Sequence, residues 1–218
     1  EALRVLGEWD HIARAESPGA LVYGYINLRL LEEIFADEVP FHRWPFSSAL
    51  GLQDSVYVLL GAPNHPVWDD RATTGTVEDR DDIIARSVAY GLFDLREEHG
   101  DKPKDWRWGD AHQIEFRNQA LGESGIGIIE RIFNRGPYPA NGDSATVNVA
   151  HWAFAEPFAV TSTVSQRAIY DLADPNNSRF VHTTGQSGHP FHRHYDDMIE
   201  PWTEVQYHPA NFTYAEAQ

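Results

Sequence analysis

Apolar residues recur at intervals of three and four positions in two long stretches of the first half of the chain. This spacing gathers the apolar side chains on one face of a helix. The first stretch comprises Leu21, Val22, Tyr25, Leu28, Leu31, Ile34 and Phe35. Ser17 before it can cap the free N–H groups of a helix, and Pro18 fits the first turn, where its missing N–H costs nothing. The pattern predicts a helix that begins at Ser17-Pro18 and is ended by Val39-Pro40.

The second stretch predicts a helix over 79–99. Its buried face comprises Ile83, Ile84, Val88, Leu92 and Leu95. Asp79, Asp81 and Asp82 lie at its amino end, where negative charge favours a helix, and Gly100 follows as a stop. A shorter helical stretch is expected over 48–60.

Beyond Gly136 the pattern favours β structure. Strand-like segments cover 145–154, 159–172 and 180–184, and the turn sequence Asp174-Pro175-Asn176-Asn177 joins the last two. A short helix over 193–202 and a final strand over 204–208 complete the prediction. We therefore expect an α+β chain with a mainly helical region at 1–135 and a mainly β region at 136–218.

Charge restricts the class of partner. The 218 residues carry 33 acidic and 17 basic side chains, which gives a formal net charge of −16. Such a surface repels phosphate, so we expect neither nucleic acid nor an anionic membrane as a partner. No apolar run reaches the roughly 18 residues that a membrane span needs. The sequence opens on Glu1 and not on methionine, which suggests a processed or excised piece.

The chain contains no cysteine, which excludes disulfides, zinc–thiolate sites, iron–sulfur clusters and a thiol nucleophile. Nucleotide-binding and serine-hydrolase motifs are also missing. There is no phosphate-binding P-loop, and neither of two Gly-x-Ser-Gly sequences, at 122–125 and 185–188, has the final glycine of a nucleophile elbow.

Two polar and aromatic clusters each allow two interpretations. Trp106-Arg107-Trp108 is either a stacking or cation–π site or a packed turn with aromatic anchors. In the segment 142–148, a glycine turn presents Asp143 ahead of an expected strand that carries Thr146 and Asn148. These polar side chains either line a pocket or cap the loop through bonds to the backbone.

A third cluster contains three histidines, His189, His192 and His194, followed by Asp196 and Asp197. Imidazoles and carboxylates suit zinc, iron or manganese. The cation of Arg193 within the cluster opposes a metal ion. A free-standing metal- or ligand-binding domain built on these histidines is nevertheless an alternative function.

With these motifs in view, the chain resembles the C-terminal part of the β chain of the penicillin amidase (penicillin acylase) family of N-terminal-nucleophile hydrolases. The resemblance rests on five segments in the family's order, namely 9–38, 106–112, 142–148, 168–178 and 184–202. The most specific is Thr184-Gly185-Gln186-Ser187-Gly188-His189-Pro190 followed by His194-Tyr195-Asp196-Asp197. The chain departs from the family where His192-Arg193 replaces its usual Ser-Pro, and where Asn141-Gly142 replaces a pair of glycines.

The resemblance implies strands that complete a layered αββα core shared with sequence outside this chain. It also implies a precursor that cleaves itself into chains, and a nucleophile at the first residue of the β chain that uses its own α-amine as base. Glu1 has no hydroxyl or thiol for this role. The family's nucleophile and oxyanion-hole asparagine lie upstream of the matched region, so no catalytic group is expected here and this chain alone is expected to be inactive.

The resemblance further implies a small-molecule N-acyl amide substrate of β-lactam, acyl-homoserine lactone or lipopeptide type, and as partners the other chains of the same precursor. It implies export to the periplasm or the medium, no cofactor for catalysis, and any structural calcium held outside this region. Asp143 and Asn148 are expected to line the pocket. The family motif is expected to be structural, and its residues are Gly185, Gln186, Ser187, Gly188, His194, Tyr195, Asp196 and Asp197. A non-catalytic relative is a further alternative.

Overall fold

The computed structural model describes residues 1–38 and 49–212, which form two compact units. Unit 1 comprises Glu1–Gln113 and Pro139–Ser162, and unit 2 comprises Ile114–Tyr138 and Thr163–Gln218. The helices are α1 (Ala2–Gly7), α2 (Pro18–Phe35), α3 (Ala49–Leu60), α4 (Arg80–His99), α5 (Trp108–Ala111), α6 (Gly127–Phe133) and α7 (Ile199–Thr203). The strands are β1 (Gln113–Phe116), β2 (Arg135–Pro139), β3 (Ala150–His151), β4 (Ser162–Thr163), β5 (Gln166–Ile169), β6 (Arg179–His182) and β7 (His208–Pro209).

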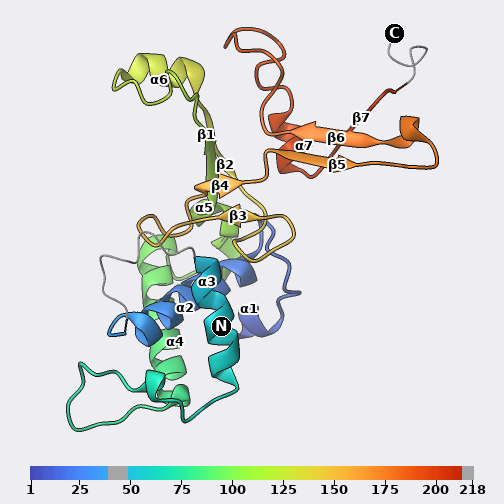
Figure 1. The fold of residues 1–218 in the computed structure, drawn as a ribbon. Coiled ribbons are helices and arrows are strands. Elements are labelled where there is room, and N and C mark those ends of the chain that lie inside the picture. The colour runs from blue at the N-terminus through green and yellow to red at the C-terminus, as the bar shows by residue number, and fades with distance from the viewer. Residues whose placement is uncertain (39–48, 213–218) are drawn as a thin grey trace. The chain divides into compact units, whose positions relative to one another are not determined.

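The two long helices of unit 1 confirm the sequence prediction. The Ser17 hydroxyl accepts a hydrogen bond from the Ala20 N–H at 3.1 Å and caps α2. Asp79 caps α4 and forms a capping box with Asp82. The helices pack side by side (Figure 1). Gly91 of α4 permits this close approach, because a Cβ there would lie 2.8 Å from the Cα of Ile26.

Aromatic side chains fill the core of unit 1. The apolar face of α2 packs against Leu95 of α4 and against Trp106, Trp108, Trp152 and Phe158. Trp106 and Trp108 are each only 1% exposed. A second cluster gathers the C-terminal half of α2 with Val56, Trp68 and Ile83. The two tryptophans of the Trp106-Arg107-Trp108 segment therefore serve mainly as core.

Unit 2 holds a three-stranded antiparallel sheet in the order β5-β6-β7 (Figure 1). The register pairs Gln166 with His182 and Ile169 with Arg179, while Phe180 pairs with His208. Trp202 of α7 is buried, and the guanidinium of Arg167 lies 4.3 Å from its ring centroid. Strands β1 and β2 form a separate two-stranded ladder.

The described residues are a mixture of helices and small sheets, as an α+β chain requires, but the strands are shorter than predicted. Within 145–154 only β3 is a strand, because the hydroxyl of Thr146 bonds the backbone of Asp143 and Asn148 and holds the segment before β3 in a turn. The expected helix over 193–202 is limited to α7, and the final strand begins at His208, later than expected. Val205 between them has a positive φ of 57°, which interrupts regular structure.

The division into units also differs from the expected boundary near residue 135. The chain leaves unit 1 after Gln113, returns at Pro139 and leaves again after Ser162. Each unit is therefore assembled from two separate stretches of sequence, which a linear change in composition does not reveal. Within the described ranges, no helix combines the length and the apolar character needed to cross a bilayer.

Candidate functional site

The family-like motif of 184–198 forms a closed loop in unit 2. The Ser187 N–H donates to the His194 carbonyl at 2.9 Å, and the Met198 N–H donates to the Thr184 carbonyl at 2.8 Å. Gly185 is required between them, because a Cβ at this position would lie 2.3 Å from the His194 carbonyl oxygen. Backbone bonds thus draw the two halves of the motif together.

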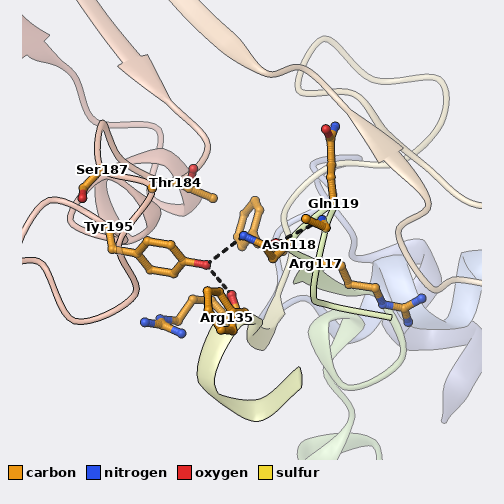
Figure 2. Close-up of a pocket in the computed structure, with 11 residues that line it drawn as sticks. Arg117, Asn118, Gln119, Arg135, Thr184, Ser187 and Tyr195 are labelled. Atoms are coloured by element: carbon orange, nitrogen blue, oxygen red, sulfur yellow. Dashed lines mark hydrogen bonds between the residues drawn. The ribbon is translucent and has the colours of Figure 1, made fainter. Parts of the chain in front are cut away.

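This loop forms one wall of a cavity of about 370 Å³ (Figure 2). Thr184, Ser187, Gly188 and Tyr195 come from the motif, and the remaining lining residues lie in 116–120 and 133–135. The Tyr195 hydroxyl donates to the Phe133 carbonyl at 2.6 Å and accepts from the Asn118 side-chain amide at 3.4 Å. The phenol ring therefore fixes the loop to the opposite wall.

Arg135 reinforces that wall. Its guanidinium lies 4.6 Å from the centroid of the Tyr195 ring and donates to the Pro190 carbonyl at 3.0 Å. It also forms a salt bridge with Asp196. Asp196 thus anchors the loop. The carboxylate of Asp197 lies 2.6 Å from Nδ1 of His194, and the side chain of Gln186 is exposed.

The three histidines of the motif are engaged in local hydrogen bonds. The Nδ1 atoms of His189 and His192 accept from the backbone N–H groups of Phe191 and His194. Both ring nitrogens of His194 are occupied, by Asp197 and by the Arg193 guanidinium. In the ranges that the structure describes, no group of three or more histidine or carboxylate side chains is arranged to hold a metal ion.

Asp143 belongs to unit 1 and is fixed by local bonds. Its Oδ1 accepts from the Ser144 N–H at 2.7 Å and from the Trp152 indole N–H at 2.8 Å. The preceding Gly142 has a φ of 93°, and a Cβ there would lie 1.9 Å from the Asn148 carbonyl oxygen, so only glycine fits this turn. The side chain of Asn148 donates to the Asn141 carbonyl at 3.2 Å.

A second cavity, of about 290 Å³, lies in unit 1 next to Asp143. Its walls are largely aromatic, from Trp9, Tyr23 and Trp108, and Asp143 supplies a carboxylate. Asp143 therefore lines a cavity and also makes loop bonds, and its place in a substrate pocket stays a prediction. Asn148 is absent from the lining of this cavity.

The tryptophan pair around Arg107 is a packed turn. Trp106 donates its indole N–H to the Gly100 carbonyl, and Trp108 donates to the Gly142 carbonyl, each at 2.8 Å. Arg107 is exposed and donates hydrogen bonds to backbone carbonyls.

His112, stacked on Trp108, is fully buried, and burial lowers the pKa of its imidazole. Because Nδ1 faces the Phe158 carbonyl at 2.7 Å, that nitrogen carries the proton.

The sequence analysis did not identify several residues that line each cavity. Asn118, Gln119 and Arg135 line the motif cavity, and they could not be predicted because no recognisable sequence pattern surrounds them. Tyr23 lies on the predicted helix α2, and nothing in the helical pattern indicates that its side chain lines a cavity. Long-range packing brings these residues to the cavities, whereas Trp108, Asp143, Ser187 and Tyr195 lie in segments that the sequence pattern singles out.

The model of one protein family, described as penicillin amidase, matches residues 1–218. The chain belongs to the penicillin amidase family. Relatives include the acyl-homoserine lactone acylase QuiP of Pseudomonas aeruginosa, 32% identical over 95% of this chain and 26% of that protein. QuiP of Pseudomonas fluorescens strain Pf0-1 is 32% identical over 97% of this chain and 26% of that protein. Penicillin acylase 2 proenzyme of a Pseudomonas species is 26% identical over 49% of this chain and 14% of that protein.

This penicillin amidase family member spans about a quarter of the length of the QuiP proteins that it matches. The relatives are acylases, so the family is one of amide hydrolases.

Within the motif loop, the Ser187 hydroxyl accepts a hydrogen bond from the His189 N–H. The rings of the nearby histidines make the local hydrogen bonds described above.

Proposed function

We propose that this chain is the C-terminal portion of an acylase that hydrolyses the amide bond of N-acyl compounds. The observation that carries the proposal is the match to the penicillin amidase family over all 218 residues. Acyl-homoserine lactones are the favoured substrate class among those expected, since the QuiP relatives match more of the chain, at higher identity, than the penicillin acylase does.

The nucleophile in this proposal lies on another segment of the same precursor. Attack on an amide needs a hydroxyl or thiol with a base within hydrogen-bond reach. In the motif cavity the Tyr195 hydroxyl is occupied by Phe133 and Asn118, and the Ser187 hydroxyl accepts from His189. The cavity side chains thus serve the loop's own structure, which agrees with a structural role for the motif.

Exposed apolar side chains favour the binding of a partner chain. Tyr57 and Val58 on α3 are 82% and 72% exposed, and Phe93 on α4 is 62% exposed. Large exposed apolar side chains grouped on helices are typical of surfaces that another chain covers. We propose that the remaining chains of the precursor cover them, within a shared αββα core, and that the assembled protein is exported.

The experiment is a substrate comparison on the complete, processed protein. Release of homoserine lactone from a set of N-acyl-homoserine lactones is measured by chromatography, next to release of the β-lactam nucleus from benzylpenicillin. The proposal expects hydrolysis of the lactone series with the higher kcat/KM. Intact substrates of both classes, under conditions where processing of the precursor is complete, would refute the acylase function and leave the non-catalytic relative.

A further inference from the structure

The cavity beside Asp143 has an unusual combination of groups. Trp9 and Tyr23 lie with ring centroids 5.5 Å apart, and Trp108 adds a third aromatic wall. Asp143 supplies the acidic group of the lining, which also contains His11, with its ring centroid 5.4 Å from that of Trp9, but no lysine or arginine. Aromatic faces and a carboxylate both attract positive charge.

One oxygen of Asp143 is fully used and the other is open. Oδ1 receives both local donors, the Ser144 N–H and the Trp152 indole N–H. Over the described residues, no hydrogen bond or ion pair reaches Oδ2. The carboxylate is therefore held rigidly by one oxygen while the second remains able to accept from a ligand.

The negative charge of Asp143 affects Tyr23, another residue that lines the cavity. The pKa of the Tyr23 hydroxyl is raised, first by burial and second by the charge of Asp143. Arg14, which follows the lining residues Trp9, His11 and Ala13 in the sequence, pairs with Asp10 at 2.6 Å. Another cavity of unit 1, lined by Glu32, Glu33 and Asp37 near the C-terminal end of α2, is also acidic. It differs from the Asp143 cavity because its lining contains a cation of its own, Arg29, which pairs with Glu32 at 2.7 Å.

We propose that the Asp143 cavity binds an organic cation, an ammonium or guanidinium group whose apolar body lies against Trp9, Tyr23 and Trp108. The positive charge lies against Asp143 Oδ2, where the carboxylate balances it. The volume of about 290 Å³ accommodates a small amine or the end of one basic side chain. Two sources share this chemistry: a free amine, and a lysine or arginine of another segment of the precursor. The inference does not depend on the proposed acylase activity.

The test uses tetramethylammonium as the probe and tert-butanol as its neutral counterpart of similar shape. Binding to the full chain is followed through the ¹H–¹⁵N signal of the Trp152 indole, which bonds Asp143. The probe should shift this signal, and tert-butanol should not. Asp143→Asn keeps an oxygen acceptor for Ser144 and Trp152, so the loop is retained while the charge is lost. It should weaken probe binding about tenfold or more.

Asp110→Asn is the matched control, because Asp110 is an exposed aspartate of the same unit outside the cavity lining. It should bind the probe as the unchanged chain does. Tyr23→Leu removes one aromatic wall and should also weaken binding. Equal shifts with tetramethylammonium and tert-butanol, or unaltered probe affinity in Asp143→Asn, would overturn the proposal.

The same measurement on the complete processed protein separates the two sources. Retained probe binding there identifies a site for a free amine. Loss of probe binding on assembly, together with weaker association of the Asp143→Asn chain with its partners, identifies a basic side chain of another segment. If neither the chain nor the complete protein binds the probe and Asp143→Asn assembles normally, the cavity has no cation function and the inference is wrong. None of these readouts requires hydrolysis, so they are independent of the acylase proposal.

Discussion

The guanidinium of Arg135 lies 4.6 Å from the ring centroid of Tyr195, and this contact joins two stretches of unit 2 that are 60 positions apart. The same guanidinium bonds the Pro190 carbonyl and Asp196. One side chain therefore holds the loop of the family motif from three directions. The side chain of Arg135 is 20% exposed, so these interactions are only partly screened by solvent.

Replacement of Arg135 should loosen the motif loop. Arg135→Ala removes the stacking and charged hydrogen bonds and should cost about 1–2 kcal/mol of local stability. The amides of Ser187 and Met198, whose N–H groups close the loop, should then exchange with solvent roughly tenfold faster. Hydrogen exchange measures this directly. Arg117→Ala is the control, because Arg117 lines the same cavity but pairs with exposed acids, and equal acceleration in both variants would contradict the assignment.

The cap of α2 offers a test of helix stability. Ser17 is buried and its hydroxyl accepts from the Ala20 N–H. Ser17→Ala should lower the free energy of unfolding by about 1 kcal/mol, whereas Ser17→Asp retains an acceptor and should lose much less. Urea unfolding curves provide the comparison. Identical midpoints for the alanine and aspartate variants would show that the cap does not contribute.

Tyr25 should make stability fall at high pH. Its hydroxyl donates to Glu98 at 2.5 Å, and burial, followed by Glu98, raises the pKa of the phenol. Above the unfolded value of about 10 the unfolded chain loses the proton while the folded chain keeps it. Folding is therefore disfavoured as the pH rises beyond that value. Tyr25→Phe should flatten the decline between pH 10 and 11, and the exposed Tyr57→Phe should leave it unchanged.

His112 should act in the opposite pH range. Burial lowers the pKa of its imidazole, against smaller opposing effects from the Phe158 carbonyl and Asp143. Below the unfolded value of about 6.5 the unfolded chain takes up a proton that folded His112 resists, so stability present at higher pH is lost as the pH falls. His112→Gln should reduce this acid decline, measured by thermal unfolding from pH 7 to 5. The exposed His192→Gln should not, and equal slopes would refute the assignment.

The local elements were predictable because their determinants are local. The cap at Ser17, the capping box at Asp79 and the apolar spacing on both helices are all within one or two turns, and α2 and α4 form where the pattern places them. Strands depend on distant partners. Residues 145–149 have strand-like composition, yet Val147 is fully exposed and the Thr146 hydroxyl holds the segment as a turn.

The cavities were predictable only in part for the same reason. Ser187 and Tyr195 belong to the motif of 184–198, which can be recognised by its sequence. Asp143 belongs to another recognisable segment, 142–148. Asn118 and Arg135 have no motif around them, and Tyr23 lies on α2 outside the apolar stripe that predicts the buried face. Their role depends on a chain that crosses between the units more than once, which sequence pattern does not encode locally.

The most direct test of the account is a comparison of amide hydrolysis by this chain and by the same chain joined with the other processed chains of its precursor. The substrate is an N-acyl-homoserine lactone, and the readout is released homoserine lactone. We predict no turnover by the chain alone and turnover after reconstitution. Turnover by the purified chain alone would contradict the claim that the nucleophile lies on another segment.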